Sequence, residues 1–557
     1  MNKLPGKNFS GRQGKALLLG AFLFSLAGCG GGGQPSSEPS SSSQGATSDS
    51  SSVSSSSQAP EIKNYDMVEG VKNDQGLSYE IFVPAFADSN GDGTGDFKGI
   101  EQKADYLASM GVSRVWLMPI HPSSSYHGYD VNDYYAVRSD YGSMADFESM
   151  LAALKAKGID VIIDMVLNHS GINHPWFAQA VEDYRDDNIN PDSKKDWYVF
   201  SDHGGAGYSQ YRGVYYECNF SSSMPEFNFD CSAVRDEIEN IFKFWLRKGV
   251  AGFRLDAVLY YYYNNDALNG DVCEFFRDCV SDEFPDCYFV GEGWTSNNTL
   301  LKNYYPSKMG TFFDFERSFA GKNLFGGTAK GMNEGKEFTD SIQSAVNAIK
   351  EACPTSYPSF FISNHDGDRP SESLYKEEWL KTAASLIYLM PGTPYIYYGE
   401  EINLYGVRGS EQTDGMRRLP MVWKNDNDEY RCNVPDAQVR SLAKEVVWAE
   451  HGATDLEAVA KSTDNHYKKV GNVRNRLKGI VNATIESIDS GERDVVDYIL
   501  NAEKRYQILT NVGDSAKTVE IKEGTLFDSI DTSSIAPKIE GKQLTIAPYS
   551  TVVIELS

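Results

Sequence analysis

The segment Gly252-Phe253-Arg254-Leu255-Asp256 is a short apolar run that ends in charged side chains. A helical pattern precedes it, with apolar residues at helical spacing over residues 234–246 and a terminating glycine at position 249. A brief apolar strand beside an amphipathic helix is typical of parallel sheets that are buried on both faces. This segment therefore predicts one strand–helix repeat of an α/β fold.

The same alternation recurs along the chain. Helical patterns separate most of the predicted strands, and one helix is expected to begin at a capping box formed by Ser143 and Asp146. Eight strands that alternate with helices predict an α/β fold of the (β/α)8 TIM-barrel type. The predicted strands lie at residues 79–86, 112–120, 160–169, 251–258, 288–294, 311–316, 359–366 and 394–401.

Two regions depart from this alternation. The connection after the third predicted strand is far longer than an ordinary strand–helix loop, which indicates an inserted subdomain. Short alternating segments near the C-terminus indicate antiparallel strands, and we expect a C-terminal β-sandwich domain there. The expected organisation is a barrel over residues 63–478, interrupted by the insertion over 170–232, and a β domain over 479–557.

The N-terminus has the composition of a targeting segment. Basic residues up to Lys15 precede an apolar stretch over 16–27, so residues 1–28 are predicted to be a signal peptide rather than a spanning helix. Leu26-Ala27-Gly28-Cys29 resembles a bacterial lipobox, which implies lipid attachment at Cys29; the alternative is ordinary cleavage near small residues. Residues 29–62, rich in Gly and Ser, predict a flexible linker. We therefore expect an extracytoplasmic protein that a lipid anchors to the membrane of the cell envelope.

The composition limits the class of partner. The chain has 557 residues and a formal net charge of −26, which disfavours binding to nucleic acid because phosphate contacts need clustered Lys and Arg. A neutral substrate is compatible with this charge, and a monomer is expected. Seven cysteines follow Cys29, so at least one of the seven has no partner within the chain. Cys218 and Cys231 could close one loop, but spacing does not establish connectivity.

Polar and charged side chains stand at the ends of four predicted strands. In a barrel the carboxyl ends of the strands form the active-site face, so these side chains are expected to converge. Any one of them alone is better explained as a solvated loop residue, but four such ends together favour a catalytic site. The four ends read Asp164-Met-Val-Leu-Asn168-His169, Gly252-Phe-Arg254-Leu-Asp256, Gly291-Glu292-Gly-Trp294 and Asn364-His365-Asp366.

These four segments resemble the motifs of the α-amylase family, glycoside hydrolase family thirteen. Met224-Pro-Glu-Phe-Asn228 and the segment around Pro391-Gly-Thr-Pro394 strengthen the resemblance, which runs from residue 79 to the C-terminus. It implies a catalytic barrel, an inserted domain and a C-terminal β-sandwich. It also implies a bacterial lipoprotein α-amylase whose partner is an α-glucan, such as starch or maltooligosaccharides.

The resemblance assigns three catalytic carboxylates. Asp256 is implied as the nucleophile, Glu292 as the general acid/base and Asp366 as the residue that grips sugar hydroxyls. A retaining glycosidase needs one ionised carboxylate to attack the sugar and one protonated carboxyl to donate to the leaving oxygen. Arg254 shares a strand face with Asp256 and favours its ionised form. The other implied sugar contacts are Tyr129, His127, His169, His365 and Arg369.

Two positions bear on specificity. Exo-acting α-glucosidases of the family tend to carry Asp where this chain has Tyr126, which favours an endo-acting enzyme. After Asp256, many amylases carry Lys and His where this chain has Leu259 and Tyr260. Leu259 removes an ammonium contact on the leaving-group side. Tyr260 in place of His puts a second calcium site in doubt. The Tyr260 ring could either stack on sugar or pack under the insertion.

The loop after the first predicted strand is a candidate calcium site. Alternating oxygen side chains on a glycine-rich loop suit a hard cation, although position 99 is Gly rather than the final Glu of an EF-hand. The loop resembles the calcium loop of some α-amylase relatives; the alternative is an Asx-rich turn. The candidate Ca2+ ligands are Asp88, Asn90, Asp92, Thr94 through its carbonyl, and Asp96.

The expected function is retaining, endo-acting hydrolysis of α-1,4-glucosidic bonds. Within the family, the alternatives are an α-glucosidase, a cyclomaltodextrinase or a transglycosylase. Outside enzymes, the alternative is a non-catalytic glucan-binding surface lipoprotein, and intact Asp256, Glu292 and Asp366 argue against it. A purely structural lipoprotein would leave the strand-end carboxylates unexplained.

Overall fold

The computed structural model describes residues 76–318, 323–408, 413–459, 462–532 and 536–557. The signal peptide, Cys29 and the linker predicted for residues 1–62 lie outside these ranges. One compact unit, residues 58–557, contains everything described below. Within the described ranges, no helix combines the length and the apolarity needed to cross a lipid bilayer.

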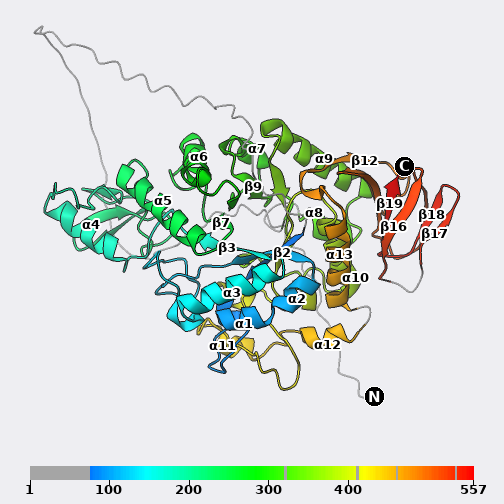
Figure 1. The fold of residues 1–557 in the computed structure, drawn as a ribbon, viewed down its shortest axis with the longest axis horizontal. Coiled ribbons are helices and arrows are strands. Elements are labelled where there is room, and N and C mark those ends of the chain that lie inside the picture. Colours follow the sequence, from blue (N-terminus) through cyan, green and yellow to red (C-terminus); the bar gives the residue numbers. More distant parts are fainter. Residues whose placement is uncertain (1–75, 319–322, 409–412, 460–461, 533–535) are drawn as a thin grey trace, which may run out of the picture. The chain divides into compact units, whose positions relative to one another are not determined.

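Eight parallel strands form the central sheet, and the prediction of a TIM barrel is confirmed (Figure 1). Their spatial order is β10-β9-β8-β7-β3-β2-β1-β11. A parallel bridge between Phe361 and Tyr395 joins the segment after β10 to β11 and closes the ring. The strands are β1 (Leu77–Ile81), β2 (Val112–Leu117), β3 (Asp160–Met165), β7 (Gly252–Leu255), β8 (Tyr288–Gly291), β9 (Gly310–Phe313), β10 (Tyr357–Ser359) and β11 (Tyr395–Tyr397).

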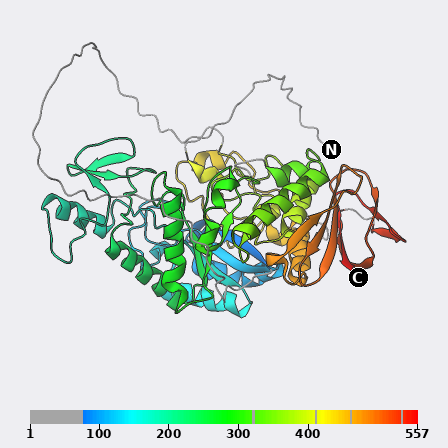
Figure 2. The same ribbon diagram turned by 90° about the horizontal axis from the view of Figure 1, so that it is seen from above.

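Helices cover the outside of the barrel strands (Figure 2). The predicted capping box is present: Ser143 accepts the N–H of Asp146, whose side chain accepts the N–H of Ser143. The helices between or after barrel strands are α1 (Phe97–Gln102), α2 (Ala104–Ser109), α3 (Met144–Ala156), α5 (Ser232–Arg247), α6 (Asp266–Ser281), α7 (Asn298–Leu301), α8 (Leu324–Ala329), α9 (Gly335–Ala352), α10 (Glu377–Tyr388), α11 (Arg440–Ala443), α12 (Ala453–Glu457) and α13 (Thr463–Arg476).

The long connection between β3 and α5 contains helix α4 (Pro175–Arg185) and a small antiparallel sheet of order β4-β6-β5. Its three strands are β4 (Phe200–Ser201), β5 (Tyr208–Tyr211) and β6 (Val214–Glu217). A bridge between His169 and Glu226 joins the insertion to the segment after the third barrel strand, and a second bridge, Tyr198 to Phe227, lies within the insertion. The insertion therefore contributes residues beside the carboxyl ends of the strands.

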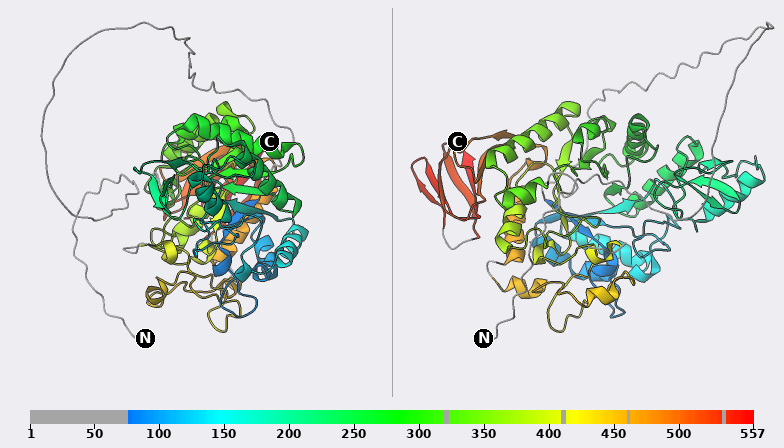
Figure 3. Two further views of the ribbon diagram at one scale, coloured as in Figure 1. Left: turned by 90° about the vertical axis from the view of Figure 1, so that its left-hand side faces the viewer. Right: turned by 180° about the vertical axis from the view of Figure 1, so that it is seen from behind.

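The C-terminal region is antiparallel throughout, as predicted, and its orange and red strands appear in Figure 3. One sheet has the order β12-β13-β14-β19-β16 and the other β15-β18-β17. Apolar residues from both sheets, including Leu509 and Leu544, form a shared buried cluster, as in a β-sandwich. The strands are β12 (Thr484–Ser487), β13 (Val495–Asn501), β14 (Arg505–Asn511), β15 (Lys517–Glu520), β16 (Gly524–Ile530), β17 (Lys538–Glu540), β18 (Gln543–Ile546) and β19 (Thr551–Leu556).

Several predicted strands are too long. The first was expected to reach residue 86, but β1 ends at Ile81 and a 3-10 turn follows over Val83–Ala85. The seventh was expected over residues 359–366, whereas β10 ends at Ser359. The physical reason is burial beyond the strand: Phe82 and Phe86 are at most 1% exposed, so the apolar pattern continues into a packed loop.

Candidate active site

Arg254 is the centre of the site. It lies on β7 with its side chain 1% exposed, and it contacts carboxylates from three neighbouring strand ends. Its Nη1 lies 2.9 Å from Asp164 Oδ1 and 2.6 Å from Asp256 Oδ1, and its Nη2 lies 2.6 Å from Glu292 Oε1. A planar guanidinium with several donors can hold more than one carboxylate in a fixed geometry. The barrel therefore brings Asp256 and Glu292 together around one cation.

The backbone between Asp256 and the next turn contributes to this geometry. Ala257 adopts a left-handed conformation with φ of 51°, which is uncommon for a residue with a side chain. Its N–H donates to Glu292 Oε2 at 3.0 Å. Tyr261 donates its hydroxyl to the Asp256 carbonyl at 3.1 Å. The turn thus fixes the Glu292 carboxyl relative to the backbone that carries Asp256.

Burial favours the protonated form of the Glu292 carboxyl. It raises the pKa of this carboxyl to about 8, and the charges of Asp256 and Asp366 act in the same direction, against Arg254 and the Ala257 N–H. Desolvation is the largest of these causes. A carboxyl with this pKa remains protonated at neutral pH, as a general acid requires.

Asp366 is held in the opposite state. Burial alone would raise its pKa, but His365, Arg418 and Arg254 together hold it well below its usual range. His365 Nε2 lies 3.0 Å from Asp366 Oδ2, and Arg418 Nη2 lies 3.0 Å from Oδ1. Two carboxyl groups with pKa values driven apart by their environments are the pattern expected of an acid and an ionised partner.

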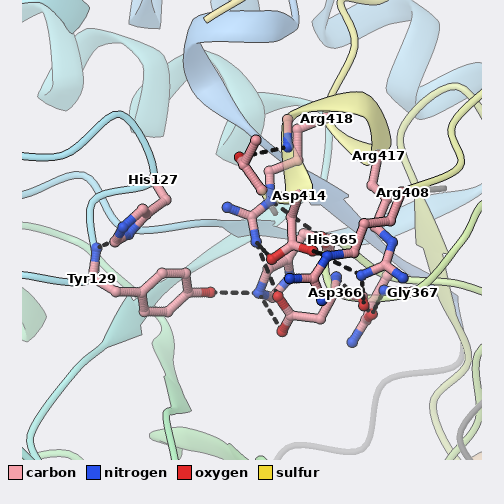
Figure 4. A network of polar contacts seen from close by, with 12 residues as sticks. His127, Tyr129, His365, Asp366, Gly367, Arg408, Asp414, Arg417 and Arg418 are labelled. Atoms are coloured by element: carbon pink, nitrogen blue, oxygen red, sulfur yellow. Dashed lines mark hydrogen bonds and ion pairs between the residues drawn. The ribbon is translucent and has the colours of Figure 1, made fainter. Parts of the chain in front are cut away.

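The predicted aromatic and histidine contacts gather at the same place, and Figure 4 shows His127, Tyr129 and His365 among them. The Tyr129 hydroxyl lies 2.6 Å from His365 Nε2 and donates to Asp164 Oδ2 at 3.1 Å. The ring of His127 stacks on Tyr129 with centroids 5.9 Å apart. His169 Nε2 lies 3.1 Å from the Tyr129 carbonyl. The structure therefore brings Tyr129, His127, His169 and His365 to one wall of the site.

Arg369 is placed differently from the sequence interpretation. It is 1% exposed, and its guanidinium donates to the backbone carbonyls of Arg417 and Tyr398. These contacts make it a packing residue under the site rather than a sugar contact. Arg418 is the arginine that reaches Asp366, and the sequence analysis missed it because it lies far beyond the end of β11 rather than directly at a strand end.

The family model described as alpha amylase, catalytic domain, matches residues 80–482. The chain belongs to the α-amylase family. α-Amylase 3 of Dictyoglomus thermophilum is 33% identical to this enzyme over 523 residues, which is 86% of this chain and 93% of that protein. The solved structure of Eubacterium rectale Amy13B matches with a TM-score of 0.81 at 31% identity, covering 88% of this chain and 97% of that one.

Family membership spans more than one named activity. An oligo-1,6-glucosidase of Parageobacillus thermoglucosidasius is 31% identical over 446 residues, covering 72% of this chain and 74% of that protein. The chain is therefore an α-amylase-family glycoside hydrolase that acts on glucans, and the bond it prefers has to be argued from its own site.

Aromatic side chains from the insertion and from the segments after Asp256 and Glu292 are partly exposed to solvent. Tyr260 packs against Phe220 with ring centroids 4.8 Å apart and against Tyr263 at 6.4 Å. Phe220 is 37% exposed and Tyr263 is 56% exposed. Trp294, two residues after Glu292, is 38% exposed and stacks on Phe315 at 4.9 Å. Tyr260 thus packs at the insertion, and its neighbours leave aromatic surface open to solvent.

The calcium loop of the prediction forms a series of Asx turns. The Asp88 carboxylate accepts three backbone N–H groups of the loop at 2.6 to 3.0 Å. Asp92 accepts the N–H of Thr94, and Asp96 caps helix α1 by accepting the N–H of Gly99. The oxygen donors have the chemistry of a calcium site. Within the described residues, however, no three His, Cys, Asp or Glu side chains are gathered closely enough to hold a metal ion, so calcium remains a prediction.

The described part of the enzyme contains seven free cysteines, including Cys218 and Cys231. The loop closure that spacing allowed between these two is therefore absent from the described residues. Burial raises the pKa values of five of the seven, to about 11 for Cys218 and about 12 for Cys279, which keeps them as thiols. The other three are Cys273, Cys287 and Cys432.

Proposed function

We propose that this enzyme is an endo-acting α-amylase that hydrolyses α-1,4-glucosidic bonds in starch and maltooligosaccharides with retention of configuration. The observation that carries the proposal is the pair of carboxylates, Asp256 and Glu292, that share the Arg254 guanidinium. Two carboxylates held by one cation lie close together. This favours the short distance between the carboxyl groups of a retaining enzyme over the longer distance that leaves room for water in an inverting enzyme.

Asp256, Glu292 and Asp366 have different roles in this reaction. Asp256 attacks the anomeric carbon while Glu292 protonates the glycosidic oxygen, and the leaving chain departs. Glu292, now ionised, takes a proton from water, which attacks the same carbon and releases Asp256. Asp366, kept ionised by His365 and Arg418, accepts hydrogen bonds from sugar hydroxyls and holds the distorted ring.

Two features support internal bonds of long chains as the substrate. Tyr126 stands where exo-acting relatives tend to carry Asp, and its hydroxyl lies 3.5 Å from Nη1 of Arg418, the arginine that binds Asp366, so a neutral side chain borders the site. The exposed rings of Phe220 and Tyr263 offer apolar faces on which the leaving part of a glucan can stack.

Product analysis over time on amylose, pullulan and cyclodextrin tests the proposal. We expect the viscosity of starch to fall while few reducing ends have formed, with mixed maltooligosaccharides as the first products of amylose. Glucose as the only early product, with unchanged viscosity, would identify an exo-acting α-glucosidase instead. Preferred cleavage of cyclodextrin would identify a cyclomaltodextrinase, and longer products than the substrate would identify a transglycosylase.

We also propose that the Asp88 loop binds Ca2+ in a structural role, through Asp88, Asn90, Asp92, Asp96 and the carbonyl of Thr94. A ligand that binds only the folded state stabilises it, by about 2.7 kcal/mol at a concentration 100 times its Kd. We therefore expect a chelator to lower the Tm by several degrees and added Ca2+ to restore it.

The matched variants for this prediction are Asp88→Asn in the loop and Asp105→Asn outside it, where an exposed carboxylate pairs with Lys157. Differential scanning calorimetry should show that Asp88→Asn loses its response to Ca2+ and that Asp105→Asn keeps it. A wild-type Tm that is the same with chelator and with Ca2+ would contradict a calcium site here.

Finally, we propose that the enzyme is extracytoplasmic and anchored through a lipid on Cys29. The lipobox-like segment and the Gly/Ser-rich residues 29–62 support this proposal. A flexible tether suits an enzyme whose polymeric substrate is outside the cell. A monomer remains our expectation.

A further inference from the structure

Glu80 is a buried carboxylate that none of the roles above uses. It lies on β1, and its side chain is 1% exposed. Its Oε1 lies 2.5 Å from Nδ1 of His365, whose side chain is also 1% exposed. The other ring nitrogen, Nε2, lies 3.0 Å from Asp366 Oδ2 and 2.6 Å from the Tyr129 hydroxyl. One imidazole is thus enclosed between two carboxylates from opposite sides of its ring.

An imidazole can donate from both nitrogens only when it is protonated. A neutral ring would direct a lone pair at one of the two carboxylates, with no water between them at these distances. Burial disfavours the charge, yet Asp366 and Glu80 outweigh burial and raise the pKa of His365 to about 10. The contacts and the raised pKa therefore both indicate that the His365 ring is protonated.

The other groups around this ring are consistent with that state. The Trp116 ring meets His365 edge-on at 5.6 Å, and Tyr129 stacks on it at 5.6 Å. Asp164 adds a nearby carboxyl that interacts with His365 across the Tyr129 hydroxyl. Arg418 donates to the His365 backbone carbonyl rather than to the ring, and Arg254 lies over the Trp116 and Tyr129 rings.

We propose that Glu80 is a positioning residue that holds His365 as a doubly donating imidazolium, and through it fixes Asp366 in its ionised, sugar-binding orientation. Glu80 itself touches no substrate in this proposal. The consequence for catalysis rests on the proposed role of Asp366, whereas the charge on His365 does not depend on any substrate.

The variant Glu80→Gln tests the proposal, because the amide keeps the size of the side chain and an acceptor oxygen while removing the charge. Loss of an opposite charge at this distance is expected to lower the pKa of His365 by about 1 to 3 pH units. The imidazole 15N and 1H shifts of His365, assigned by comparison with His365→Asn, measure that pKa directly in the enzyme without substrate. We expect a ring that stays protonated through pH 9 in the wild type and titrates near or below pH 9 in Glu80→Gln.

Glu401→Gln is the matched control, since Glu401 is another buried carboxylate at the same end of the barrel, bound by the hydroxyls of Tyr79 and Tyr106. It should leave the titration of His365 unchanged. The ratio of kcat/KM at pH 6 to kcat/KM at pH 9 should be about tenfold larger in Glu80→Gln than in Glu401→Gln. Loss of a residue with a merely structural role would not change this ratio.

The two readouts separate the possible failures. A Glu80→Gln variant that folds and keeps His365 charged through pH 9 overturns the proposal. A shifted His365 titration without any change in the pH dependence of kcat/KM overturns the link to Asp366 only. If the enzyme is not an endo-amylase, the titration of His365 still tests the proposal, because it is measured without substrate. The pH dependence of kcat/KM can be measured on any α-glucan that the enzyme cleaves.

Discussion

Replacing Asp256 by Asn is expected to lower kcat on starch by on the order of 10⁵-fold, because an amide cannot form the covalent bond to the sugar. The change is nearly isosteric, and Arg254 keeps its contacts with Asp164 and Glu292, so the fold should survive. Reducing-end assays give the rate, and circular dichroism with thermal unfolding checks the structure.

Asp271→Asn is a suitable control, because Asp271 is exposed on helix α6. It should have wild-type activity. The comparison also addresses the non-catalytic alternative, since Asp256→Asn should still bind glucan while the control both binds and cleaves it. Equal starch-degrading rates for the wild type and Asp256→Asn would mean that the barrel does not act through this carboxylate.

Glu292→Gln should lower kcat on starch by roughly 10³-fold, the scale of lost general acid–base catalysis. The loss in the first step should be much smaller on a glycosyl fluoride or an aryl α-glycoside, since these leaving groups depart without protonation. The burst of released fluoride or phenol measures this step separately from the hydrolysis of the intermediate. A burst rate reduced as strongly on the activated substrate as on starch would contradict the role of Glu292 as an acid.

The Glu292 carboxyl also determines how kcat/KM falls at alkaline pH. Glu292 acts in its protonated form, and its pKa is raised to about 8, so wild-type kcat/KM should be maintained below that pH and fall as pH rises through it. In Glu292→Gln this limb should disappear, because the amide does not titrate in the range. A persistent limb near pH 8 in the variant would assign it to another group.

Much of the fold was predictable because barrel strands are buried on both faces and carry continuous apolar runs. Their ends were not predictable to the residue, since Phe82 and Phe86 are as buried in the loop after β1 as the strand itself. The capping box at Ser143 was predictable because both of its partners lie within one helical turn.

Asp256 and Glu292 were predictable because each follows directly on a strand, where the barrel gathers side chains. Asp366 was predicted from its motif, although β10 ends at Ser359 and Asp366 lies in the loop beyond it. Arg418 and Glu80 were not. Arg418 reaches Asp366 from a segment after the last strand, and Glu80 lies within β1, where its sequence position gives no sign of the 2.5 Å contact with His365. Arg369 shows the opposite error, since its position suggested a sugar contact and its guanidinium packs against backbone carbonyls.

The most direct test of the mechanism is to trap and locate its covalent intermediate. A fluorinated α-glucosyl or α-maltosyl fluoride forms this intermediate quickly and hydrolyses it slowly, so the labelled enzyme can be digested and sequenced by mass spectrometry. We expect one added glycosyl group, on the peptide containing Asp256 and at that residue, and none in Asp256→Asn. A label on another carboxylate, or rapid turnover with no labelled peptide and a product of inverted configuration, would contradict the mechanism.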